Sequence, residues 1–132
     1  MAKRSRSRSP RPTDSELSLL RVLWGRGPST VREVQEVLSA EKPTGYTTVL
    51  KLMQIMTDKG LVVRDERKRT HIYRARVPAE QTQQQLVADL LDRAFEGSAD
   101  QLVMRALSAK RVSPEELARI RALLDEIERE QQ

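Results

Sequence analysis

The sequence predicts a mainly α-helical protein with one small β-hairpin. Two observations lead to this fold class. Along most of the chain, apolar residues recur every three or four positions, which is the spacing of one buried helix face, and capping residues, prolines and glycines divide them into short helices. Residues 61–77 instead hold two runs rich in β-branched residues around a charged cluster, which is typical of two strands and their turn.

The composition excludes most kinds of active site. The chain of 132 residues contains no cysteine and a single histidine, His71, which excludes disulfides, thiolate chemistry and cysteine metal sites. It has neither a calcium-loop spacing of carboxylates nor a glycine-rich phosphate loop, so we expect no enzyme activity, cofactor or metal. No apolar run approaches the roughly 20 residues that span a bilayer, and no apolar segment follows the basic start, so we expect a cytoplasmic protein.

Charge is divided unevenly along the chain. Residues 1–12 carry five basic and no acidic groups and little apolar surface, which predicts a disordered basic tail. Such a tail either solvates the protein or serves as an arm that contacts phosphates or a minor groove. Residues 1–78 carry 17 basic and 8 acidic groups, whereas residues 79–132 carry 7 basic and 11 acidic groups. The basic front half suggests a polyanionic partner.

Three short helices are predicted after the tail. Thr13 and Glu16 have the spacing of a capping box for the first, and Ser29 is the predicted cap of the second. The third ends at Gly60, where a positive φ costs least. The apolar stripe of the second helix is Val31, Val34, Val37 and Leu38, and that of the third is Val49, Leu52, Met53 and Met56.

The third predicted helix has a polar side that allows two interpretations. Thr47, Leu50, Lys51 and Gln54 lie opposite the apolar stripe. The polar side chains among them can hydrogen-bond base edges or phosphates. Tyr46, Thr47 and Thr48 form the first turn, where free amides favour a phosphate. A merely solvated polar face is the alternative interpretation.

A hairpin is predicted directly after the third helix. Its tight turn contains Arg67, Lys68 and Arg69, which we expect to meet phosphates and so to position the protein without reading sequence. Three helices followed by a hairpin are the layout of a winged helix-turn-helix domain, here residues 13–78, whose third helix enters the major groove of DNA.

The second predicted domain, residues 79–132, is entirely helical. Short helices that each carry one apolar stripe seldom fold alone, so we predict a symmetric homodimer. Folding of these helices back onto their own first domain is the alternative. The residues expected to bury against the partner copy are Leu90, Leu91, Leu117, Ile120, Leu124 and Ile127.

Six segments together resemble a known family. They are TDSELSLLRVLW, STVREVQEVL, YTTVLKLMQIMTDKGLV, HIYRA, LVMRAL and VSPEELARIRALLDEIE, and they extend over most of the chain beyond the tail. The chain is similar in these segments to the penicillinase-repressor regulators of bacteria (the BlaI, MecI and CopY type). The resemblance implies a winged-helix homodimer that represses transcription at an inverted-repeat operator. It also implies DNA contacts from Ser29, Thr30, Tyr46, Thr47, Thr48, Lys51 and the hairpin turn.

The chain departs from this family at two sites of regulation. The copper-responsive branch senses metal through a C-terminal cysteine motif, which this sequence lacks. The β-lactam-responsive branch is inactivated when a membrane-linked protease cuts an Asn–Phe bond. The matching bond here is Arg105–Ala106, so an inactivating protease is implied as a partner but its cleavage bond differs.

We therefore hypothesise a dimeric, sequence-specific DNA-binding repressor. The alternative is a winged-helix protein-interaction or assembly module whose third helix docks on protein. Salt separates the two, because DNA binding weakens steeply as salt rises whereas an apolar protein contact does not.

Overall fold

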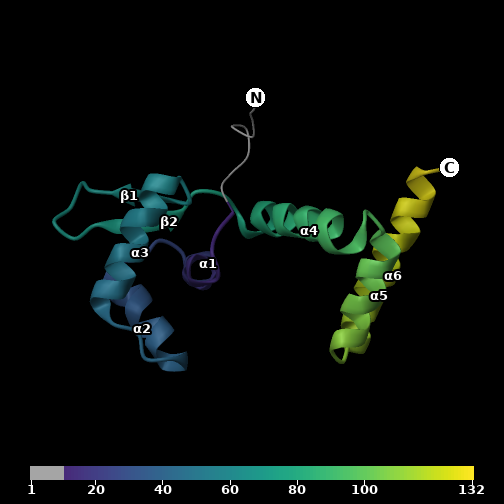
Figure 1. Cartoon of the computed structure of the whole chain (residues 1–132), viewed down its shortest axis with the longest axis horizontal. Coiled ribbons are helices and arrows are strands. Elements are labelled where there is room, and N and C mark those ends of the chain that lie inside the picture. The colour runs from purple at the N-terminus through teal and green to yellow at the C-terminus, as the bar shows by residue number, and fades with distance from the viewer. Residues whose placement is uncertain (1–10) are drawn as a thin grey trace. The chain divides into compact units, whose positions relative to one another are not determined.

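The computed structural model describes residues 11–132, so the predicted tail lies outside the described residues except for Arg11 and Pro12. Over this range the chain forms six helices and one two-stranded antiparallel sheet (Figure 1). The elements are α1 (Asp14–Arg26), α2 (Val31–Glu41), α3 (Tyr46–Lys59), β1 (Val62–Asp65), β2 (Ile72–Ala75), α4 (Ala79–Phe95), α5 (Ala99–Ala109) and α6 (Pro114–Glu130).

The described residues separate into two compact units, divided between Leu86 and Val87. The dividing point lies inside α4. The predicted domain limit after residue 78 coincides with the start of α4, and as a functional boundary it stays a prediction. None of the helices within residues 11–132 combines the length and apolar character that crossing a membrane requires.

Local sequence sets the ends of most helices. Helices α1, α2 and α6 each begin with a capping box, in which a Thr or Ser side chain accepts from the amide three residues on and the glutamate there accepts from the cap amide. The predicted box of Thr13 and Glu16 is confirmed. The predicted cap at Ser29 is wrong, because Thr30 caps α2. Helix α3 ends as predicted at Gly60, whose φ is 82°.

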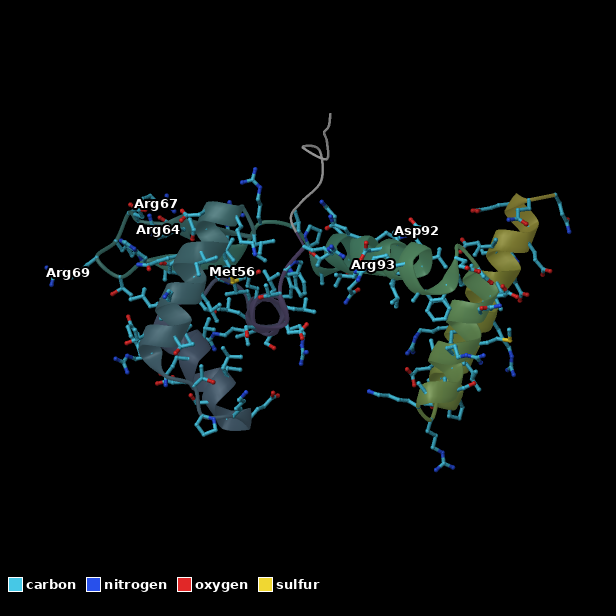
Figure 2. The ribbon with its side chains drawn as sticks, in the orientation of Figure 1. Met56, Arg64, Arg67, Arg69, Asp92 and Arg93 are labelled. Atoms are coloured by element: carbon cyan, nitrogen blue, oxygen red, sulfur yellow. The ribbon has the colours of Figure 1, made fainter. Side chains whose placement is uncertain are left out.

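One hydrophobic core joins α1, α2, α3 and the hairpin in the first unit. The predicted buried stripe of α3 is confirmed at Val49, Met53 and Met56, and Figure 2 shows Met56 on the side of α3 toward α1. In α2 the stripe is buried only in part, because Val37 remains 43% exposed. The buried apolar residues of this core are Leu19, Leu20, Leu23, Val31, Val34, Val49, Met53, Met56, Leu61, Val62 and Tyr73.

The hairpin is fixed to the helices through Tyr73. Within the sheet Arg64 lies opposite Tyr73, whose side chain is buried. On its other edge Tyr73 pairs with Ser29, and the two residues exchange amide-to-carbonyl hydrogen bonds of 2.8 and 2.9 Å. Residues 66–71 link the strands, so the connection is wider than a tight turn, as expected for a turn whose ERKR segment lacks glycine.

The second unit has no interior of its own. No residue between positions 83 and 132 is buried. Large apolar side chains on each helix instead face solvent, as shown by exposures of 48% for Leu90, 52% for Met104 and 54% for Leu124. A single copy of the chain therefore leaves the apolar stripes of this unit uncovered.

Candidate nucleic-acid interface

Helix α3 turns its predicted polar side to solvent. Val49 and Met53 are fully buried and hold the helix against the core. Thr47, Lys51 and Gln54 are exposed. Leu50, which is predicted on the same side, is instead half-buried against the core. No salt bridge within residues 11–132 involves Lys51, so its charge is available to a partner outside the chain. The core packing thus presents a row of hydrogen-bonding groups and one free cation.

The N-terminus of α3 is open, unlike those of α1 and α2. Gly45 is its N-cap, no side chain caps the helix, and its first turn contains no acidic residue. In α1 and α2 a capping box with a glutamate occupies the corresponding position. The amides of Tyr46, Thr47 and Thr48 therefore have no partner from a cap, and with the positive end of the helix dipole they favour a phosphate.

Ser29 does not belong to this surface. Its side chain is fully buried, and its hydroxyl donates to the Gly27 carbonyl at 2.8 Å and accepts from Arg26 Nε at 2.9 Å. Pairing with Tyr73 draws Ser29 into the interior, so its hydroxyl is not at the surface of this structure, and its DNA contact stays a prediction. Thr30 is half-buried, and its hydroxyl accepts from the amide of the third residue of α2. Its hydroxyl proton remains able to donate.

One cleft brings α2, α3 and the hairpin together. It has a volume of about 490 Å³ and is lined by Thr30, the N-cap of α2, by Arg32 of α2, by Tyr46 of α3, and by Arg69 and His71 of the hairpin. The guanidinium carbon of Arg32 lies 5.3 Å from the centre of the Tyr46 ring, a cation–π contact. Sequence reasoning missed Arg32 and His71, because no local pattern distinguishes them from other surface residues.

The cations of the hairpin turn differ in how far they are already paired. Arg67 binds Asp65 through two nitrogens, with Nη2 to Oδ2 at 2.8 Å and Nε to Oδ1 at 3.1 Å. These bonds, and a further one from the Arg67 amide, lower the pKa of Asp65 to about 2. Arg64 is paired with Glu66. Of the three predicted phosphate contacts, Lys68 and Arg69 therefore remain without a carboxylate partner.

Lys68 and Arg69 are the unpaired cations of the hairpin turn, since no salt bridge in the described part of the chain involves either residue. Both are exposed. Figure 2 shows Arg69 projecting outward from the tip of the hairpin, whereas Arg64 and Arg67 lie along its edge. The structure therefore ranks the predicted contacts: Arg67 must first release Asp65 before it can hold a phosphate with the same nitrogens.

The apolar residues predicted for dimerisation lie on α4 and α6. Leu90, Leu124 and Ile127 are among the exposed large apolar side chains, and the other three are half-buried. Arg105 and Ala106, which flank the bond that matches the protease site, are both exposed within α5.

Comparison with known proteins identifies the family. The family model described as penicillinase repressor matches residues 12–126. The chain belongs to the penicillinase-repressor family. The transcriptional regulator BlaI of Mycobacterium tuberculosis, in both the CDC 1551 / Oshkosh and the H37Rv strains, is 32% identical to this family member over 116 residues, which cover 87% of this chain and 83% of the relative.

Two solved structures resemble this penicillinase-repressor family member in fold. The solution structure of the DNA-binding domain of the repressor BlaI matches with a TM-score of 0.50 and 20% identity, over 56% of this chain and 90% of its own. The complex structure of hsRosR-S4 matches with a TM-score of 0.53 and 16% identity, over 98% and 100% of the two chains. The predicted winged-helix fold is thus confirmed, and the family assignment confirms a transcriptional repressor rather than an enzyme.

Proposed function

We propose that the protein is a homodimeric repressor that binds an inverted-repeat DNA operator, with α3 of each copy in the major groove. The observation that carries this proposal is the polar side of α3, which is exposed over Thr47, Lys51 and Gln54. It begins at an open helix N-terminus and lies on a domain whose cleft contains no acidic residue. Base edges in the major groove offer donors and acceptors to such side chains, and phosphates suit the flanking cations and amides.

The second unit supports dimer formation. Its helices leave large apolar side chains half exposed, including Val103, Leu123 and Leu124 at 44%, 54% and 54%. Covering apolar surface contributes about 25 cal/mol for each Å² removed from water, and a second copy supplies a self-complementary surface for it. A dimer also links two winged-helix domains, which can bind two half-sites at once. This favours an operator with two-fold symmetry.

Cleavage within α5 would separate DNA binding from dimerisation. A protease that cut between Arg105 and Ala106 would divide α5 and detach α6 from the DNA-binding unit. Because dimerisation is proposed to depend on α6, the two winged-helix domains would then bind half-sites separately. The affinity gained from their linkage would be lost.

Selection from a random duplex pool tests the proposal directly. The full chain should enrich a symmetric motif with two half-sites, and its affinity for this motif should fall steeply with salt. A matched duplex with one half-site scrambled is the control, and it should bind much more weakly. If no motif is enriched and the affinity for DNA does not change with salt concentration, the proposal is overturned in favour of a protein-interaction module.

A further inference from the structure

We infer that Arg32 is a contact for the DNA backbone, that Tyr46 holds its guanidinium in place, and that the cleft between α2, α3 and the hairpin receives a phosphate. The inference rests on the proposed function. It goes beyond that function by adding a residue that no sequence motif indicated, and by giving Tyr46 a positioning role.

The Arg32–Tyr46 contact places the guanidinium without giving it a hydrogen-bond acceptor. The distance of 5.3 Å from Arg32 Cζ to the ring centre places the cation against the aromatic ring. A guanidinium has five N–H donors, and a contact with one aromatic ring fills none of them with a hydrogen-bond acceptor, so donors remain able to bind a phosphate. The contact also restricts the side chain before DNA arrives, so less conformational entropy is lost on binding.

The cleft around this contact has the chemistry of an anion site. Two guanidinium groups, from Arg32 and Arg69, line it, and no aspartate or glutamate does. No salt bridge in the described ranges involves either arginine. Nearby arginines are already paired, Arg26 with Glu33 at 2.9 Å and Arg67 with the aspartate two residues before it. Arg32 therefore differs from its neighbours in having an orienting contact but no carboxylate partner.

Its place in the fold favours a phosphate over a base. Arg32 is the second residue of α2, and in a helix-turn-helix domain the helix before the recognition helix crosses the backbone rather than entering the groove. Tyr46 is the first residue of α3, so the cation–π contact lies where the open end of α3 also favours an anion. We therefore expect Arg32 to strengthen binding to all sequences alike.

The test is a salt titration of binding to the selected operator and to a random duplex. Arg32→Ala should weaken both by a similar factor, roughly tenfold at moderate salt, as expected for loss of a charge-assisted hydrogen bond. It should also lower the slope of log K against log salt by about 0.9 for each protomer bound. Arg21→Ala, which removes an exposed arginine from α1 outside the cleft, is the matched control and should leave both unchanged.

A second pair of variants tests the positioning role of Tyr46. Tyr46→Phe keeps the aromatic ring, so Arg32→Ala should weaken binding by the same factor in this background as in the parent. In the Tyr46→Leu background, Arg32→Ala should cost clearly less, because the guanidinium is no longer held in place. Thermal unfolding of each variant checks that the domain is intact, and Arg32→Gln replaces Arg32→Ala if the alanine variant unfolds.

Three results would overturn the inference. If Arg32→Ala and Arg21→Ala have the same DNA affinity and the same salt slope, Arg32 does not contact the DNA. A change in sequence preference with an unchanged salt slope would make Arg32 a base reader. A parent protein that binds neither DNA in a salt-dependent way would overturn this inference and the proposed function together, and that outcome is visible before any variant is measured.

Discussion

Lys59 Nζ lies 2.8 Å from one carboxylate oxygen of Glu16 and 3.0 Å from the other. Glu16 is 3% exposed and belongs to the first turn of α1, where it also accepts a hydrogen bond from the Thr13 amide at 2.9 Å. Lys59 is the last residue of α3. This ion pair therefore joins the start of α1 to the end of the helix that carries the proposed DNA-reading face.

The Glu16–Lys59 pair predicts how stability depends on pH. Burial raises the pKa of Glu16, but hydrogen bonds from Lys59 and from the Thr13 amide outweigh it, and the pKa falls below its ordinary value of 4.5. A carboxyl with a lower pKa in the folded state stabilises the fold above its unfolded pKa and loses this contribution as pH falls. We expect the free energy of unfolding to decrease as pH drops below 4.5, and Glu16→Gln to make this decrease shallower, as measured by urea denaturation between pH 7 and pH 3.

The two members of this pair should not be equivalent. Lys59→Met leaves a buried carboxylate without its cation and should destabilise the protein by about 3 kcal/mol at pH 7. Glu16→Gln leaves a lysine that is 32% exposed and partly hydrated, so about 1–2 kcal/mol is expected. Asp58→Asn, at an exposed neighbour, is the control and should stay within about 0.5 kcal/mol of the parent. Equal losses from both pair variants would contradict this account of the pair.

Helix α3 gives a second prediction. Thr47→Ala and Lys51→Ala should each weaken binding to the selected operator by roughly 1–3 kcal/mol per half-site, because both side chains lie on the exposed side of the helix. Their thermal midpoints should match that of the parent, since neither residue is in the core. Lys110→Ala, which removes an exposed lysine beyond α5, is the control for lost charge. Parent-like operator binding by both α3 variants would show that another element reads the DNA.

The hairpin gives a third prediction, which follows from its internal ion pair. Arg69→Ala should weaken DNA binding more than Arg67→Ala, because Arg67 is already held by Asp65 whereas Arg69 has no carboxylate partner in the described chain. Asp65→Asn should release Arg67 and strengthen binding to operator and random DNA alike. Titrations with both duplexes at several salt concentrations measure these changes. The ranking is wrong if Arg67→Ala proves the more damaging variant and Asp65→Asn has no effect.

A fourth prediction concerns assembly. Ile120→Asp places a carboxylate on the apolar stripe of α6, where burial against a second copy would remove its hydration. We expect this variant to sediment as a monomer and to lose tight operator binding, although its first unit stays folded. Ala118→Asp adds the same charge at an exposed position of α6 outside the predicted stripe, and it should remain dimeric. Sedimentation of the unmodified protein as a monomer at micromolar concentration would refute the proposed dimer.

The sequence by itself determined the features that depend on neighbours along the chain. The capping box of Thr13 and Glu16 joins residues three positions apart, so a reader of the sequence sees both partners together. The buried side of α3 follows from the fixed period of a helix, which also decides that Lys51 faces away from Met53. Such features need no knowledge of how the elements pack.

Only the tertiary structure decided which distant residues meet. Glu16 and Lys59 are 43 positions apart, and their pairing depends on the way α1 and α3 share one core. Ser29 looks like an exposed cap in sequence, yet strand pairing with Tyr73 buries it. Arg32 meets Tyr46 only because α2 and α3 pack together. The physical reason is that hydrophobic burial, which drives the packing, is not directional, so a sequence pattern indicates which faces are buried but not which side chains they bring together.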